Sequence, residues 1–364
     1  MGGFTIANEK MWRLLMGKRA MGMRIKIATA MISKRDRFYE AAIPSAFFLD
    51  TEVAGLEHYL RGREWLKPGE FVVSAEIAGQ GNMNSVVRVA THERTFILKQ
   101  SRPWLEKYPE ISAPFDRSLM EGEFYRTVSN TPAAAFMPKF YWVDDESHIL
   151  CLEDIGVVPD FSNIYADAKM TLDELKQLCR FLSLLHSFPS RIANREMRML
   201  NHFHIFVYPF QAENGLDLDG ITPGLEQIGL KVKGNRALVQ CVTKLGQIYL
   251  SEGEFLLHGD YFPGSWLHGV TGVRVIDPEF GFAGPREFDV GVMLGHLVLS
   301  GMEHAVTSLG CQYALWEELD HKLILNFAGV EILRRLLGVA QLPITHDLGQ
   351  KRGLIEVAIS MVLA

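Results

Sequence analysis

The stretch that decides the fold is FVVSAEIAGQGNMNSVVRVATHERTFILK, residues 71–99. Apolar and polar residues alternate through 71–77, 85–90 and 95–98, which is the period of a half-buried strand. A glycine-rich turn separates the first two of these segments, and the last one ends on a lysine. The stretch therefore predicts a hairpin-rich sheet at the start of an N-terminal lobe.

The glycine-rich turn, Gly79-Gln80-Gly81-Asn82, lies between two expected strands and not between a strand and a helix. That placement, with no Lys-Ser or Lys-Thr after it, argues against a dinucleotide-binding fold or a P-loop. Glycine lets a backbone approach a ligand closely, so a hairpin of this kind can bring N–H groups over nucleotide phosphates. Taken alone the pattern is weak, because most Gly-x-Gly pairs are simply turns.

Lys99 ends the apolar strand Phe96-Ile97-Leu98. In kinases a lysine at the end of such a strand pairs with ATP phosphates and with a glutamate of a helix. The charged segment 116–126 has helical spacing and offers Glu121 or Glu123 as the partner. A solvated lysine at a strand end is the alternative interpretation.

Two acidic turns flank a short apolar strand in the second half of the chain. His258-Gly259-Asp260 precedes the strand 273–276, Asp277-Pro278-Glu279 follows it, and Ser265 lies between them. Phosphoryl transfer needs a carboxylate at the acceptor hydroxyl and further carboxylates that hold Mg²⁺ against phosphate oxygens. The two turns provide both kinds of group, although solvated surface acids are the simpler interpretation.

The remaining pattern changes from strand-like to helical after the connector Glu153-Asp154-Ile155-Gly156. A capping box at Thr171-Leu172-Asp173-Glu174 predicts the start of one helix. Further strands are expected at 139–143 and 149–152, and helices at 172–185, in part of 224–250, at 289–300 and at 313–337. We expect an α+β fold with an N-lobe at 41–155 and a larger, mainly helical C-lobe at 156–364.

Residues 1–40 form a basic N-terminal extension in this interpretation. Within 1–30, six lysines and arginines stand against the single acid Glu9. A basic, acid-poor start is typical of a transit peptide. We favour a disordered arm or a start at a later methionine, and the segment takes no part in the fold assignment.

The overall composition is that of a globular protein, with 48% apolar and 22% charged residues. It excludes disorder for the bulk of the chain. A net charge of -6 argues against a surface that binds nucleic acid, and no apolar run approaches the ~20 residues of a membrane span. The four scattered cysteines form no Cys-x-x-Cys pair, so we expect a cytoplasmic protein without a disulfide framework or a zinc site.

Taken together, these segments resemble the aminoglycoside phosphotransferase and choline kinase superfamily, and within it the methylthioribose kinase branch. The resemblance covers most of residues 76–340. Its motifs are EIAGQGNMN (76–84), ILKQ (97–100), ED (153–154), HGD (258–260), GS (264–265), IDPEF (276–280), GP (284–285), FDVG (288–291) and RRLLGVA (334–340). The resemblance implies a bilobal protein-kinase-like fold that uses ATP and Mg²⁺ to phosphorylate a hydroxyl of a small sugar-like metabolite.

Residue roles follow from the same resemblance. Asp260 would orient the acceptor hydroxyl and accept its proton, and Asp277 and Glu279 would bind Mg²⁺, with Ser265 at the place of a further metal ligand. Arg334 and Arg335 would meet the transferred phosphate, which suits two planar cations, although an Arg-Arg pair in a helix is usually solvated. The residues that would contact ATP are Gly79, Gly81, Asn82, Asn84, Lys99, Glu121, Glu153 and Ile155.

The sequence departs from the branch near the acceptor. The family tends to read Leu-His-Thr-Gly-Ser where this chain has Tyr261-Phe262-Pro263-Gly264-Ser265. Where this chain has Ala283 and Gln341, the family usually has a tyrosine and a histidine. We therefore expect acceptor surroundings that are more apolar, with phosphoryl transfer retained. The apolar aromatics beside Asp260, Tyr261, Phe262 and Trp266, do not supply the acidic cleft that a polycation would need.

Several acceptors and one other class of protein stay open. The leading hypothesis is a methylthioribose kinase that forms the 1-phosphate in methionine salvage. A kinase of another sugar, a choline-like alcohol or an aminoglycoside is the alternative, and an ATP-binding pseudokinase that serves interaction is disfavoured because the expected lysine and carboxylates are all present. The expected partner is a small-molecule acceptor, with no nucleic acid and no membrane, and the resemblance leaves a homodimer open.

Overall fold

The computed structural model describes residues 33–79 and 83–364, which form two compact units. The N-terminal unit comprises residues 33–129 and 138–156, and the C-terminal unit comprises 130–137 and 157–364. The basic segment up to residue 32, and with it Gly81 and Asn82 of the glycine-rich turn, lie outside the described residues. No helix within the described ranges is long and apolar enough to cross a membrane.

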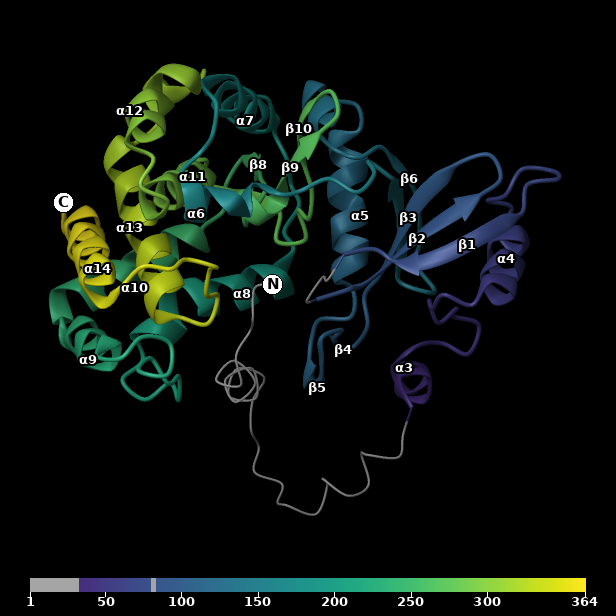
Figure 1. The fold of residues 1–364 in the computed structure, drawn as a ribbon, viewed down its shortest axis with the longest axis horizontal. Helices are drawn as coiled ribbons and strands as arrows, with labels where there is room; N and C mark the ends of the chain where they lie inside the picture. Colours follow the sequence, from purple (N-terminus) through teal and green to yellow (C-terminus); the bar gives the residue numbers. More distant parts are fainter. Residues whose placement is uncertain (1–32, 80–82) are drawn as a thin grey trace, which may run out of the picture. The chain divides into compact units, whose positions relative to one another are not determined.

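A five-stranded antiparallel sheet, in the order β1-β2-β3-β7-β6, forms the N-terminal unit (Figure 1). Its strands are β1 (Val72–Ile77), β2 (Ser85–Thr91), β3 (Thr95–Gln100), β6 (Phe140–Asp144) and β7 (Ile149–Glu153). The three strands expected within 71–99 and the two expected later are confirmed. The helical and strand content of the two units also confirms the α+β class.

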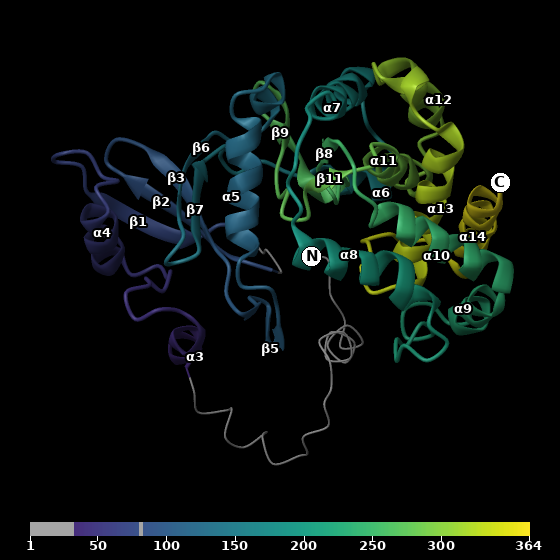
Figure 2. The same ribbon diagram turned by 180° about the vertical axis from the view of Figure 1, so that it is seen from behind.

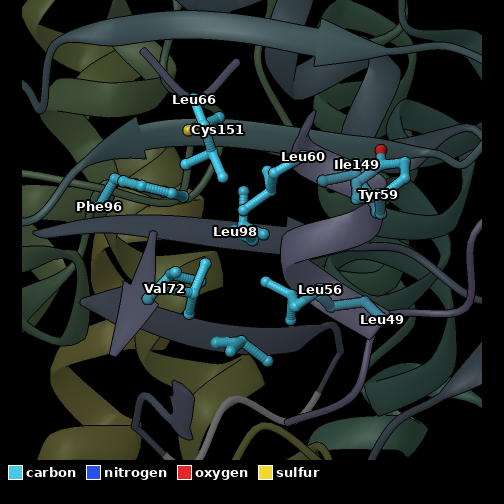
Figure 3. Close-up of a cluster of buried hydrophobic side chains, with 12 residues drawn as sticks. Leu49, Leu56, Tyr59, Leu60, Leu66, Val72, Phe96, Leu98, Ile149 and Cys151 are labelled. Carbon is cyan, nitrogen blue, oxygen red and sulfur yellow. The ribbon is translucent and has the colours of Figure 1, made fainter. Parts of the chain in front are cut away.

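Alternation along β3 sends neighbouring side chains to opposite faces of the sheet. Leu98 points toward α4 (Val53–Gly62), whereas Lys99 points toward α5 (Arg117–Val128), the helix expected from the charged segment. The buried cluster under α4 contains Leu49, Leu56, Tyr59, Leu60, Leu66, Val72, Val87, Val89, Phe96, Leu98, Ile149 and Cys151 (Figure 3). One face of the sheet is thus an apolar core, and the other carries the lysine.

Three short elements of this unit, one helix and two strands, were not predicted from the sequence. Helix α3 (Lys34–Ala41) begins with a capping box at Ser33 and buries Phe38 against Phe48 and Trp104. The strands β4 (Trp104–Leu105) and β5 (Tyr108–Ser112) form a separate hairpin. Residues 34–40, which we grouped with the basic N-terminal arm, are therefore helical and packed.

The C-terminal unit is mainly helical, and its helix α13 contacts both α11 and α14 (Figure 2). Its α-helices are α6 (Ile164–Asp167), α7 (Leu172–Leu185), α8 (Arg195–His202), α9 (Leu225–Gly234), α10 (Arg236–Tyr249), α11 (Glu287–Leu299), α12 (Glu303–Gln312), α13 (His321–Leu337) and α14 (Leu348–Leu363). Shorter helical turns are η2 (Pro132–Phe136), η3 (Phe161–Asn163), η4 (Phe203–Val207), η5 (Tyr208–Phe210), η6 (Pro263–Ser265) and η7 (Trp316–Glu318).

The capping box at Thr171 is present and starts α7, as expected. Helices in part of 224–250 are confirmed, and the segment is divided into two helices because the Asn235 side chain accepts the backbone N–H of Leu238 and caps a second start. One helix prediction was wrong in extent. The helix expected at 313–337 begins only at residue 321, where Asp320 caps it through the N–H of Leu323.

Two small antiparallel pairs, β8 (Phe255–Leu257) with β11 (Phe282–Gly284) and β9 (Trp266–Gly269) with β10 (Gly272–Val275), form the β-rich insert of this unit. The loop between β8 and β9, hereafter the catalytic loop (258–265), carries Asp260. The turn between β10 and β11, hereafter the carboxylate turn (276–281), carries Asp277 and Glu279. These strands place both acidic turns in one unit.

Candidate active site

The catalytic loop is held by a buried carboxylate on α11. Asp289 accepts the backbone N–H of His258 at 2.6 Å and that of Gly259 at 3.0 Å, and its side chain is fully buried. The His186 ring lies 3.1 Å from the same carboxylate. Because a carboxylate that accepts several N–H groups is a strong acceptor, the backbone beside Asp260 is fixed before any ligand binds.

Asp260 lies against the two consecutive arginines of α13. Its Oδ1 is 3.5 Å from Arg334 Nη2 and 3.2 Å from Arg335 Nη2. The Asp260 side chain is 16% exposed, whereas those of the arginines are only 6% and 5% exposed. The alternative of a solvated Arg-Arg pair is therefore wrong, and the pair faces the carboxylate that the sequence singled out.

Glu331, one turn earlier on α13, holds both guanidinium groups from the other side. Its carboxylate lies 3.1 Å from Arg334 Nη1 and 2.6 Å from Arg335 Nε. Burial alone would raise the pKa of Glu331, but Arg334 and Arg335 hold it well below its ordinary value. Glu331 is thus an ionised buried anion whose attraction fixes the direction of two cations.

A tyrosine–histidine pair lies behind Glu331. His296 Nε2 is 3.1 Å from the Glu331 carboxylate, and His296 Nδ1 is 2.6 Å from the Tyr165 hydroxyl. Burial lowers the pKa of His296 to about 4, so the ring is neutral. Because an ionised carboxylate only accepts, Nε2 carries the proton and the tyrosine hydroxyl donates to Nδ1. The same arrangement supports the catalytic loop, through Tyr313, His186 and Asp289.

The carboxylate turn contains a backbone conformation that residues other than glycine rarely adopt. Asp277 has φ of 60°, and the Glu279 side chain is largely buried. Aspartate tolerates left-handed backbone better than most residues with a side chain, and such residues are found at functional sites. The conformation is consistent with a turn that must aim particular carboxylates.

The donors of this turn suit Mg²⁺, which prefers hard oxygen ligands and is often held by one or two carboxylates together with substrate phosphates. Asp277 and Glu279 supply the carboxylates. Within residues 33–79 and 83–364 no three His, Cys, Asp or Glu side chains cluster as a complete metal cage. The residues therefore fit a metal that shares its ligands with a nucleotide.

Ser265 lies at the end of the turn η6 and is buried. Its hydroxyl donates to the backbone carbonyl of Asp260 at 3.3 Å, and its own carbonyl accepts the N–H of Ile276. The structure thus joins Ser265 to both acidic segments through hydrogen bonds. A role for its hydroxyl as a metal ligand stays a prediction.

The catalytic loop and the carboxylate turn contact each other directly. His258 Nε2 donates to the Ile276 carbonyl at 3.0 Å. Gly259 has φ of +84°, and a Cβ at this position would lie 2.2 Å from the carbonyl oxygen of Phe280. Only glycine fits here, both because of its conformation and because the two backbones approach so closely.

The N-terminal unit carries the residues expected to bind the nucleotide. Lys99 Nζ lies 2.7 Å from Glu121 Oε2, and both side chains are buried. Glu123 is exposed, so of the two glutamates left open by the sequence it is Glu121 that pairs with the lysine. Gly79 has φ of +71°, as a tight turn requires, and Asn84 is buried.

Arg117, one turn before Glu121 on α5, reaches the end of the glycine-rich turn. Its guanidinium is fully buried and donates to the carbonyls of Met83 at 2.6 Å and Arg102 at 2.7 Å. Helix α5 therefore holds both the lysine and the described end of the turn.

The connector 153–156 is fixed by a bidentate ion pair. Arg88 Nε and Nη2 donate to the two oxygens of Asp154 at 2.8 and 3.1 Å, and the Gly156 N–H donates to the same carboxylate. The backbone N–H of Glu153 is bonded to the Lys139 carbonyl within the sheet. Glu153 and Ile155 are expected to contact ATP, and because the Glu153 N–H is already bonded, that contact would use other backbone groups of this segment.

The three aromatic residues that the sequence places beside Asp260 differ in their burial. Tyr261 and Trp266 are fully buried in the core of the C-terminal unit, where the Tyr261 hydroxyl donates to the Leu178 carbonyl. Phe262 is half-buried and lies under the guanidinium of Arg335, 4.7 Å from it. Of the three aromatics, only Phe262 therefore contacts the arginine pair beside Asp260.

Sequence reasoning missed the residues that support this site. Glu331 stands three and four residues before the twin arginines, the spacing at which helical side chains meet, so a search for ion pairs would have found it. Asp289 lies in the FDVG motif (288–291), but the motif alone did not indicate that it holds the catalytic loop. The other supporting residues have no local signal because their partners are distant in the chain. They are Tyr165, His186, His296, Asn194 and Asn201.

Residues 74–310 match the model of the phosphotransferase enzyme family, so the chain belongs to that family. Family membership makes it a small-molecule kinase, with the reaction class that the two acidic turns predicted. The spectinomycin phosphotransferase solved with ADP and spectinomycin is 14% identical, with a TM-score of 0.50, and the match covers 87% of this chain and 98% of that one. This likeness shows the fold, and the expected kinase-like architecture is confirmed.

Three similar curated proteins are all named methylthioribose kinases. The methylthioribose kinase of Exiguobacterium sibiricum is 26% identical over 320 residues, which cover 75% of this chain and 81% of that protein. The methylthioribose kinase of a Geobacillus strain is 25% identical, with 72% and 77% covered. That of Escherichia coli is 27% identical, with 64% of this chain and 58% of that protein covered.

Proposed function

We propose that this protein transfers the γ-phosphate of ATP to the 1-hydroxyl of methylthioribose or a closely related sugar, with Mg²⁺ as cofactor. The observation that carries the proposal is the pairing of Asp260 with Arg334 and Arg335. Curated relatives named methylthioribose kinases support the acceptor. As a member of that group the enzyme would act in methionine salvage in the cytoplasm.

Positioning and charge neutralisation account for most of the catalysis in phosphoryl transfer. Asp260 orients the acceptor hydroxyl and takes its proton. The arginine pair neutralises charge on the transferred group, and Lys99 holds the nucleotide phosphates. Asp277 and Glu279, with Ser265, would hold Mg²⁺, which when bound neutralises charge on the phosphate oxygens.

The charge balance beside Asp260 suits a neutral acceptor better than a polycationic one. Arg334 and Arg335 lie within 3.5 Å of the Asp260 carboxylate and also pair with Glu331, so two cations face two anions. A polycation such as an aminoglycoside would need an excess of acidic groups around it, and these four side chains do not provide one. A neutral sugar has no such requirement.

The test measures ADP release with Mg²⁺·ATP across methylthioribose, ribose, choline and an aminoglycoside. We expect turnover with methylthioribose, and a loss of about 10²–10⁴-fold in kcat for Asp260→Asn, as for removal of a general base. Asp173→Asn, an exposed change on α7, is the matched control and should retain full activity. Preference for a cationic acceptor, or unchanged turnover by Asp260→Asn, would overturn the proposal.

A further inference from the structure

Two buried asparagines, Asn194 at the N-cap of α8 and Asn201 in its last turn, are each bonded to one of the two acidic segments. Asn194 Nδ2 donates to the carbonyls of Glu279 at 2.9 Å and Gly281 at 3.0 Å, in the carboxylate turn. Asn201 Nδ2 donates to the carbonyl of Gly259 at 2.8 Å, in the catalytic loop. These residues are 6% and 2% exposed. Because Asn194 directly precedes α8 and Asn201 lies within it, one short helix connects the two segments.

We propose that α8 is a brace that sets the position of the carboxylate turn relative to the catalytic loop, with Asn194 and Asn201 as positioning residues. The inference rests on the proposed function, because it treats Asp277 and Glu279 as metal ligands and Asp260 as the catalytic carboxylate. We assign neither asparagine a contact with a substrate. Each acts through the backbone of a residue that makes such a contact, or of its neighbour.

The brace is itself anchored between its two asparagines. Arg198, one turn after Asn194, donates from Nη2 to the carbonyls of Tyr249 at 2.6 Å and Ser251 at 2.5 Å. Its guanidinium also lies over the Phe282 ring of β11, 4.3 Å from the centroid. Because Arg198 ties α8 to the end of α10, the helix cannot shift along its axis without breaking these contacts.

Asn194 has a property that makes its amide group the decisive feature. It occupies the position before α8 with φ of 39° and ψ of 51°, a left-handed conformation that Asn and Asp tolerate better than other residues with a side chain. Its side chain caps no N–H of the helix and instead donates across to the turn. Aspartate would keep the backbone conformation and replace the donor with an acceptor that faces two carbonyl oxygens.

The hydrogen bonds of Asn194 and Asn201 fix backbone groups that the direct contact between the two segments does not reach. His258 and Gly259 contact the turn at Ile276 and Phe280. Asn194 holds the carbonyl of Glu279 itself, and fixing that peptide fixes the direction in which the Glu279 side chain leaves the backbone. We therefore expect Asn194 to act on metal affinity and Asn201 to act on the chemical step.

The experiment compares Asn194→Asp and Asn201→Asp with the matched control Asn326→Asp. Asn326, on α13, also donates its amide to two carbonyls, those of Met361 at 2.8 Å and Val362 at 3.3 Å, at a contact with α14. For Asn194→Asp we expect the Mg²⁺ concentration for half-maximal rate to rise about 5–10-fold, with kcat at saturating Mg²⁺ changed less than about threefold. For Asn201→Asp we expect a kcat about 10-fold lower at an unchanged Mg²⁺ dependence.

Hydrogen exchange without nucleotide or metal gives a second readout. Exchange should rise in the peptide that covers 276–281 for Asn194→Asp, and in the peptide that covers 258–262 for Asn201→Asp. Asn194→Gly tolerates the same backbone conformation and adds no charge, so it should shift the Mg²⁺ dependence in the same direction. This variant separates the loss of the donor from an effect of the new carboxylate.

The outcomes distinguish the inference from the function on which it rests. If the wild-type protein shows no Mg²⁺-dependent turnover, the proposed function fails, while the exchange data still test the brace. If both asparagine variants lower only the melting temperature, as Asn326→Asp should, α8 is structural and the inference is wrong. A Mg²⁺ shift in the Asn201 variant instead of the Asn194 variant would also overturn it.

Discussion

Replacing Glu331 with glutamine should destabilise the protein strongly and impair the arginine pair at the same time. The substitution is isosteric, but it removes the one buried negative charge that receives Arg334 at 3.1 Å, Arg335 at 2.6 Å and the His296 ring at 3.1 Å. Breaking a buried ion pair by removing one partner costs about 3–5 kcal/mol, because the remaining charge stays buried. At ~2–4 °C per kcal/mol for a unit of this size, the melting temperature should fall by roughly 6–20 °C.

The assay is thermal unfolding followed by steady-state kinetics at a temperature where both proteins are folded. With Glu331 neutral, the arginines have only Asp260 as a counter-ion, so we expect kcat to fall about 10–100-fold. Glu318→Gln is the matched control, because Glu318 also pairs with an arginine, at 3.0 Å, but is 58% exposed and should change the melting temperature by less than about 2 °C. Equal melting temperatures for the two variants would refute the reasoning that burial makes the Glu331 contacts strong.

Three further outcomes are expected. Lys99→Met should raise the KM for ATP about 10–100-fold, because we propose that its buried ammonium pairs with the nucleotide phosphates. Lys67→Met, at an exposed ion pair, should leave the KM unchanged, and equal KM values for the two variants would contradict the assignment. Gly259→Ala should abolish activity and lower the free energy of unfolding by more than about 2 kcal/mol, since its Cβ would meet backbone atoms. Gly301→Ala is the control, because Gly301 has a similar φ but open space around it, so that this variant measures the cost of the backbone conformation alone. Equal losses of unfolding free energy in the two variants would rule out the steric clash. The folded pKa of His296, about 4, lies below its ordinary value, so the unfolded chain binds more protons than the folded one between pH 6.5 and 4. The unfolding free energy should therefore fall as pH decreases through this window, by roughly 2–3 kcal/mol from this group. Urea titrations that show no change in unfolding free energy across the window would contradict this expectation.

The N-terminal sheet could be predicted because apolar and polar residues alternate along its strands. Residues 85–91 alternate between buried and half-buried positions along the whole of β2. The hairpin β4–β5 escaped notice because it is short and is stabilised by distant groups, among them Arg117, which donates to the Trp104 carbonyl. Periodicity reports burial of one face, and it reports nothing about a hairpin that depends on tertiary hydrogen bonds.

The site was predictable to the extent that chemistry and spacing coincide. Lys99 was singled out because it ends an apolar strand, and Asp260 because it belongs to one of two acidic turns that flank another. The choice between Glu121 and Glu123 was not accessible, since both lie on an expected helix and only the packing of α5 shows which one is buried. Asn194 had no signal at all, because an asparagine before a helix is typical of an ordinary cap.

Arg117 and Glu121 are one helical turn apart on α5, about 6 Å along its axis. Arg117 donates to the carbonyl of Met83 and Glu121 pairs with Lys99, so both contacts depend on the position of the same helix. A displacement of this helix would break the contacts of the lysine and of the end of the glycine-rich turn together, so the positions of the two would change jointly. Variants selected for weaker nucleotide binding should accordingly collect along α5, including at positions that never approach the nucleotide.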